Sequence, residues 1–128
     1  MKPSTRILRL NILNTQKKDE AALRLAAAIS EHSKQRQRLD QLQQYTEDYV
    51  QQTRSATASI RSVTELDQRH RFLGSIRQAV EQQKNVVDRA LRQLDFCQDA
   101  LLAERRECRR LELLAAKLDA DYWLKADK

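Results

Sequence analysis

The sequence predicts an all-α protein in which two long helices form an antiparallel coiled-coil hairpin. The chain has 128 residues, of which 33% are charged and 5% aromatic, and it contains one Gly and one Pro. So few turn-forming residues argue against a loop-rich fold, and so few aromatic residues favour a thin apolar seam over a thick core. The second half of the chain carries such a seam, whose members recur at alternating spacings of three and four: Leu73, Ile76, Val80, Gln83, Val87, Ala90, Leu94, Cys97, Leu101, Glu104, Cys108, Leu111, Ala115, Leu118 and Tyr122. This spacing keeps one face of a helix against a partner helix.

The first half of the chain carries a second, weaker seam, in which many positions are small or polar. Its members are Ala21, Leu25, Ala28, His32, Gln35, Leu39, Leu42, Thr46, Tyr49, Thr53, Ala56 and Ile60. A helix with this seam suits pairing with the stronger second helix better than pairing with itself. We expect a single coiled-coil hairpin over residues 1–128, with the first helix over about 5–58, the turn at about 59–61 and the second helix over about 62–125.

The start of the second helix is marked by Ser62-Val63-Thr64-Glu65, which has the form of a capping box. In this motif the Ser hydroxyl accepts a hydrogen bond from the backbone N–H of the Glu, whose side chain reaches back to the Ser. Folding the chain back about residue 61 makes the numbers of facing core residues sum to about 122. That register sets large residues against small or medium ones, as close packing requires, and it sets Lys18 opposite Glu104. Near the N-terminus Leu8, Ile12 and Thr15 are displaced by one position, so we expect the seam to be locally rewound there.

Two surfaces of the hairpin are candidate interaction sites. Tyr45, Tyr49 and Phe72 come together with Leu73 and Ile76 in an aromatic cluster that two helices cannot fully bury. An exposed apolar patch on a polar protein is typical of a docking site. The end that bears both termini has more apolar residues than two helices need for packing, so we expect a sticky tip there. In this tip the residues of the first helix face those of the second, Ile7, Leu8, Leu10, Ile12 and Leu13 against Leu111, Leu113, Leu114 and Leu118, with Tyr122, Trp123 and Leu124 beyond.

Charge and chemistry exclude several classes of function. The net charge is +6, but the densest basic cluster, Arg105 to Arg110, is interleaved with glutamates, as on a solvated helix face. No aromatic platform or nucleic-acid-binding motif accompanies it, so nucleic acid is not an expected partner. His32 and His70 are isolated, and the chain shows no phosphate-binding loop and no metal-ligand spacing. We therefore expect a protein that is not an enzyme and has no cofactor, metal or catalytic residue.

The expected location is cytoplasmic. No segment approaches the roughly 18 apolar residues of a membrane span, and the first residues do not form a signal peptide. Cys97 and Cys108 both lie on the seam, about 16 Å apart along a helix, which is too far for a disulfide. We expect both to be buried small hydrophobic residues in a reducing compartment.

Residues 39–49, LDQLQQYTEDY, resemble the L-x-x-L-x-x-Y-x-x-x-Y pattern of the flagellar export protein FliJ family. After the turn, Leu66 and Phe72-Leu73 lead into Ile76, Ala79 and Gln82-Gln83, so the motif covers about residues 39–83 and the two-helix layout covers the whole chain. The chain departs from the family in its turn, where Ser59-Ile60-Arg61-Ser62 replaces a segment that often contains glycine.

The resemblance implies a cytoplasmic coiled coil, peripheral at the cytoplasmic face of the inner membrane, that resembles the central stalk of rotary ATPases. It implies that the tip enters the export ATPase hexamer and activates it, and that the aromatic patch binds the cytoplasmic domain of the export gate. It also implies a role with export chaperones, without assigning residues. The gate-binding residues would be Leu42, Tyr45, Tyr49, Phe72, Ile76 and Ala79. The ring-facing residues would be Ile7, Leu8, Ile12, Leu111, Leu118 and Tyr122.

Two alternatives remain open at the level of sequence. The nearer one is the equivalent stalk of a virulence-type III secretion system, which shares the architecture and the mechanism. The more distant one is a generic coiled-coil scaffold, or a basic rod that binds nucleic acid.

Overall fold

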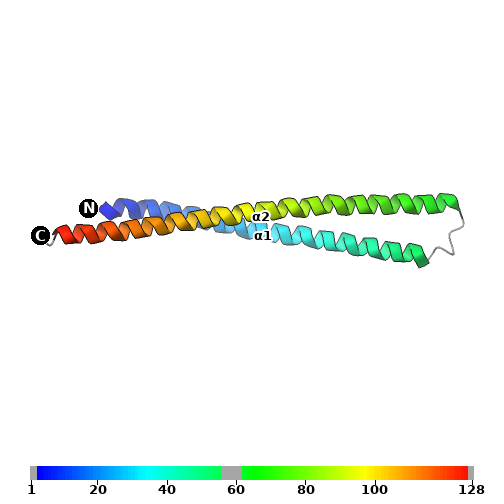
Figure 1. Cartoon of the computed structure of the whole chain (residues 1–128), viewed down its shortest axis with the longest axis horizontal. Helices are drawn as coiled ribbons and strands as arrows, with labels where there is room; N and C mark the ends of the chain where they lie inside the picture. Colours follow the sequence, from blue (N-terminus) through cyan, green and yellow to red (C-terminus); the bar gives the residue numbers. More distant parts are fainter. Residues whose placement is uncertain (1–2, 56–61, 127–128) are drawn as a thin grey trace. The chain divides into compact units, whose positions relative to one another are not determined.

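The computed structural model describes residues 3–55 and 62–126. They form two helices, α1 over Pro3–Ser55 and α2 over Val63–Ala126, and within the described ranges there is no strand (Figure 1). The predicted fold class, an all-α antiparallel coiled-coil hairpin, is confirmed. The helices start near the predicted residues 5 and 62. The predicted end of the first helix at 58 and the turn at 59–61 lie outside the described residues.

The start of α2 is stabilised by the predicted Ser62 cap. The Ser62 hydroxyl accepts a hydrogen bond of 3.1 Å from the backbone N–H of Glu65, and the Ser62 carbonyl accepts one of 3.2 Å from Leu66. The cap satisfies a backbone donor that has no partner within the helix. The Glu65 carboxylate, in the first turn, also lies 3.5 Å from the guanidinium of Arg69.

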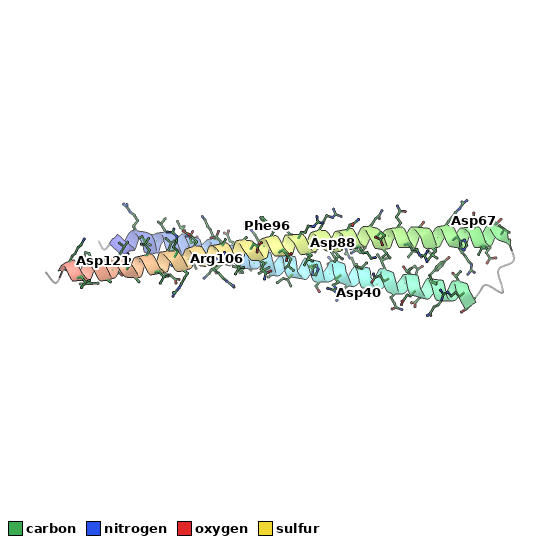
Figure 2. The ribbon with its side chains drawn as sticks, viewed as in Figure 1. Asp40, Asp67, Asp88, Phe96, Arg106 and Asp121 are labelled. Atoms are coloured by element: carbon green, nitrogen blue, oxygen red, sulfur yellow. The ribbon has the colours of Figure 1, made fainter. Side chains whose placement is uncertain are left out.

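The chain divides into two compact units, and both helices contribute to each. The first unit comprises residues 1–29 and 93–128, and the second comprises residues 30–92. In each unit a segment of α1 lies antiparallel to a segment of α2, with side chains projecting along both helices (Figures 1 and 2). Each unit is held by the two predicted seams, since the members that the structure describes are buried or half-buried, apart from the more exposed Tyr122.

The core of the first unit is a ladder of small residues facing larger ones. Ala21 and Ala28 of α1 are buried, as are five seam residues of α2: Cys97, Leu101, Cys108, Leu111 and Ala115. Both cysteines are free thiols, so the prediction that they pack as small hydrophobic residues is confirmed. Lys18 and Glu104, which the register sets opposite each other, are both half-buried.

The core of the second unit contains a polar connection between the helices. The Gln83 side chain on α2 donates one hydrogen bond to the Gln35 carbonyl at 2.9 Å and another to the Gln35 side-chain oxygen at 3.0 Å. The amide nitrogen of Gln35 in turn donates to a carboxylate oxygen of Glu31 at 2.7 Å. Gln35 is buried, and both polar atoms of its side chain are hydrogen-bonded, as buried polar groups require.

The predicted rewinding of the seam near the N-terminus is wrong. The inward-facing residues there are Ile7, Asn11, Asn14 and Lys18, which continue the spacing of three and four without a shift. Leu8 and Ile12, one residue further along, are exposed. The apolar pattern suggested a shift because the residues that occupy the seam are polar, while the apolar residues beside them point to solvent.

Candidate functional site

The aromatic patch is built across the two helices of the second unit. The ring of Tyr49, on the α1 seam, meets the ring of Phe72 on α2 edge-on, with 4.9 Å between centroids and 65° between planes. This geometry is favourable for aromatic pairs. Phe72 is nevertheless 45% exposed, and Tyr45 is 52% exposed. Phe72 and Tyr45 therefore remain partly in solvent, whereas Tyr49 packs within the seam.

The other predicted members of the patch contribute less surface. Ile76 is buried, and Leu42 and Ala79 are half-buried. In heptad terms, with Leu73 and Ile76 at positions a and d, Phe72 and Ala79 are g positions of α2, and Tyr45 is a g position of α1. In an antiparallel pair the g positions of both helices flank the seam on the same side. Tyr45, Phe72 and Ala79 thus share one side, and Ile76 forms the floor beneath it.

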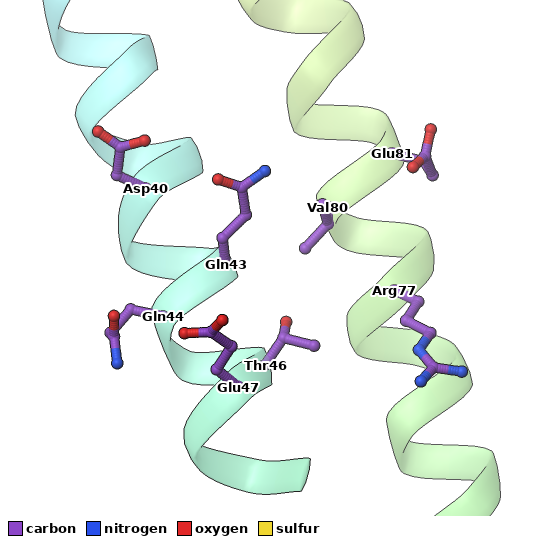
Figure 3. Close-up of a pocket in the computed structure, with 8 residues that line it drawn as sticks. All are labelled: Asp40, Gln43, Gln44, Thr46, Glu47, Arg77, Val80 and Glu81. Carbon is purple, nitrogen blue, oxygen red and sulfur yellow. The ribbon is translucent and has the colours of Figure 1, made fainter.

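The opposite side of the seam in the second unit carries a groove of about 670 Å³. Gln43 and Thr46 of α1 and Val80 of α2 extend into the space between the helices, with charged side chains around them (Figure 3). This groove was not predicted from the sequence. The feature that indicates it there is the small size of Thr46 and Val80, which face each other's helix at seam positions. The groove is lined by Asp40, Gln43, Gln44, Thr46, Glu47, Arg77, Val80 and Glu81.

The predicted tip, in the first unit, combines exposed and buried apolar residues. Leu8, Leu10, Ile12 and Leu13 of α1 are exposed, and Ile12 has the largest exposed fraction of these, 61%. The prediction that the α1 residues of the tip face α2 is therefore wrong for Leu8 and Ile12. Leu10 and Leu13 line a groove together with Leu111 of α2, and the expected surplus of apolar surface is present. Of the other predicted tip residues, Leu111 is buried and Ile7 and Leu118 are half-buried. Tyr122 is partly exposed, and its ring contacts that of Trp123 edge-on at 5.5 Å.

The basic cluster of the first unit is paired in part with glutamates on the same helix. Arg110 donates hydrogen bonds of 3.0 and 2.6 Å to the two carboxylate oxygens of Glu107, and Arg109 lies 3.7 Å from Glu112. The hydrogen bonds and the positive charge of Arg110 lower the pKa of Glu107 from its ordinary value of 4.5. The same contacts with Glu107 raise the pKa of Arg110. These groups are at the surface, so the pairing orders side chains without adding much stability.

Over the described residues, neither α1 nor α2 contains a stretch that is long and apolar enough to span a bilayer. The same residues contain no cluster of His, Cys, Asp or Glu suited to hold a metal ion.

Among the comparisons with known proteins, the one with family models gives a match. Neither the curated proteins nor the solved structures contain a match to the chain. The family model described as flagellar FliJ protein matches residues 3–128, nearly the whole sequence and both helices. Members of that family are non-catalytic components of the flagellar type III export apparatus. The chain belongs to the flagellar FliJ protein family.

Proposed function

We propose that this export component acts as a stalk-like activator of the export ATPase ring and links that ring to the membrane export gate. The aromatic patch is the gate-docking surface, and the exposed apolar residues of the tip contact the ATPase hexamer. In this role the protein works at the cytoplasmic face of the inner membrane as a peripheral component. Handling of export chaperones belongs to the same proposal, without assigned residues.

The observation that carries the proposal is the partial exposure of Tyr45 and Phe72 on the same side of the seam. Aromatic residues at the centre of a docking site often contribute the largest share of its binding free energy. The edge-on contact with Tyr49 favours one orientation of the Phe72 ring before binding, and such preorganisation lowers the entropy cost of association.

The gate half of the proposal is tested by calorimetric titration of the gate's cytoplasmic domain with the Tyr45→Ala and Phe72→Ala variants. Truncating an aromatic anchor costs about 2 kcal/mol or more, so each variant should bind about thirtyfold more weakly. The matched control is Phe96→Ala, because Phe96 on α2 is 70% exposed and belongs to the first unit, whereas the patch belongs to the second (Figure 2). Wild-type affinity in both patch variants would remove the gate assignment.

The ATPase half is tested by measuring ATP hydrolysis by the export ATPase with and without the protein. Ile12→Gln places a polar amide on the exposed surface of the tip and should reduce stimulation. Leu23→Gln makes the same kind of change at another exposed position of α1, outside the tip, and should stimulate like the wild type. If Ile12→Gln stimulates fully, with Leu8→Gln behaving likewise, the exposed face of the tip does not contact the ring.

A further inference from the structure

The outer face of α2 in the first unit has an unusual charge distribution. On a coiled-coil helix, the heptad positions b, c and f point away from the seam. Between Leu102 and Leu124, every charged residue at these positions is a cation: Arg106, Arg109, Arg110 and Lys117. The acidic residues of this segment lie at the seam or beside it, as Glu104 does at position d and Glu107 at position g. All residues of this outer face are exposed.

The same outer face also carries large apolar side chains in solvent. Leu113 is 55% exposed and Trp123 53% exposed, and Leu102 and Leu124 are exposed as well. Leu102 and Leu113 line a shallow groove together with the arginines. The aliphatic stems of arginine side chains add to the apolar surface of such a groove. The outer face of a coiled coil is normally its most polar surface, so the packing of the two helices does not account for these residues.

An internal comparison shows that this pattern is not general to the helix. The outer positions of α2 between Gly74 and Asp99 include the carboxylates of Glu81, Asp88, Asp95 and Asp99 together with arginines. That half is a mixed, solvated surface. One large apolar side chain, Phe96, is exposed at these positions, but it lies beside carboxylates such as Asp95. The change to an outer face with several large apolar side chains, cations and no carboxylate therefore occurs within one helix, after Asp99.

We propose that the outer face of α2 from Leu102 to Leu124 binds the surface of an anionic lipid membrane. Helices that lie in a membrane interface combine cations with Leu and Trp in this way, because the apolar side chains enter the acyl boundary while Lys and Arg meet anionic headgroups. The face extends about 33 Å at ~1.5 Å per residue. Its groove is shallow and lined mainly by Leu and Arg side chains, so the cations and the apolar groups can meet a lipid surface together. Arg106 has no ion-pair partner among the described residues and is available to a headgroup.

Lipid fits this face better than nucleic acid does. A nucleic-acid surface would use the arginines for phosphates but would gain little from Leu102, Leu113 and Leu124. Membrane binding deepens the proposed function by naming a surface that would hold the protein at the membrane, and the vesicle test below can fail while stimulation of the ATPase stands. Mutual exclusion of the membrane and the ring rests on the proposed stalk function, in which the segment is enclosed when the tip occupies the ATPase ring.

The test uses the full chain and its single tryptophan, Trp123, which lies on the proposed surface. Vesicles of phosphatidylcholine alone are compared with vesicles of equimolar phosphatidylcholine and phosphatidylglycerol. Tryptophan emission should shift to shorter wavelength, and the protein should co-sediment, only with the anionic vesicles. Without a blue shift on anionic vesicles, or with an equal shift on neutral ones, the proposal is wrong.

The residues are tested with two double variants of equal charge. Arg106→Gln/Arg109→Gln should weaken partitioning onto anionic vesicles about 30-fold, given the contribution of each cation near such a surface. Arg89→Gln/Arg92→Gln removes the same charge from the mixed half of α2 and should partition like the wild type. Circular dichroism confirms that both variants remain helical. Equal weakening by both variants would overturn the proposal, as would Arg106-dependent binding to duplex DNA without binding to vesicles.

Discussion

Gln83 donates two hydrogen bonds across the seam to Gln35, one to its carbonyl at 2.9 Å and one to its side-chain oxygen at 3.0 Å. Gln35 lies four residues before Leu39, the α1 residue that the register sets directly opposite Gln83, so the long side chain spans one helical turn. The contact can be made only when α1 and α2 are aligned within about one turn. It therefore favours one register in a unit whose α1 seam is otherwise poorly apolar.

We predict that Gln83→Ala destabilises the protein by about 1–2 kcal/mol, because Gln35 then keeps a buried acceptor without its donor. Gln35→Leu/Gln83→Leu removes both partners and should recover most of that loss. The free energies of unfolding of Gln35→Leu, Gln83→Leu and the double variant, measured in urea, give the coupling between the two residues. A coupling near zero would mean that the two glutamines do not support each other.

Asn11→Leu should stabilise the protein by about 1–3 kcal/mol. Asn11 lies on the seam, and its Oδ1 is buried without a hydrogen-bond partner among the described residues. The register sets Asn11 opposite the buried Leu111, so a leucine at position 11 would extend the apolar seam. Thermal unfolding by circular dichroism measures the gain. Gln16→Leu, on the exposed side of α1, is the control and should leave the melting temperature nearly unchanged.

Gly74→Ala should stabilise α2 by about 1 kcal/mol, since glycine is a poor residue for a helix interior. A Cβ added at Gly74 meets no atom within 4 Å, so the methyl group costs nothing in packing. Urea unfolding should show a higher midpoint with an unchanged slope. A decrease in stability would indicate that the backbone at position 74 is not regular helix in solution.

The Glu107–Arg110 pair predicts a pH dependence with a definite sign. The pKa of Glu107 is lowered by the Arg110 hydrogen bonds and charge, so the folded state holds the ionised carboxylate more strongly than the unfolded chain does. The stabilisation is complete above the ordinary pKa of 4.5 and is lost as the pH falls through the lowered value. Arg110→Gln should therefore melt only slightly below the wild type at neutral pH, as expected for a surface pair, and together with it in strong acid. A Glu107 carboxyl titration by NMR that does not move in Arg110→Gln would refute the pairing.

The two seams and the hairpin were predictable from the sequence because periodicity survives several polar members. Gln35, His32 and Thr46 stay on the line that Ala21, Leu25 and Ala28 establish. Local composition misled at the N-terminus, where Leu8 and Ile12 are more apolar than Asn11 and yet point outward. Which residues occupy the seam is determined by the periodicity of the helix over many turns. A short stretch of sequence does not reveal that periodicity.

The candidate surfaces were predictable to different degrees. Tyr45 and Phe72 could be assigned because each lies one residue from a seam position, and partial exposure follows from that spacing. The cationic face of α2 was not recognised, because along the sequence Arg105 to Arg110 alternate with glutamates. Sorting these residues by heptad position separates Arg106 and Arg109 on the outer face from Glu104 on the seam.

The burial of Cys97 and Cys108 within the first unit has a consequence for dynamics. A thiol with almost no exposed surface reacts with a small disulfide reagent only when the surrounding structure opens, so its labelling rate reports the free energy of that opening. Because the two thiols lie three turns apart on α2, their rates would show whether this part of the hairpin separates as one body or frays from its terminal end. The labelling rates of Cys97 and Cys108 thus measure the local stability of the α1–α2 pairing beside the proposed ring-contacting tip.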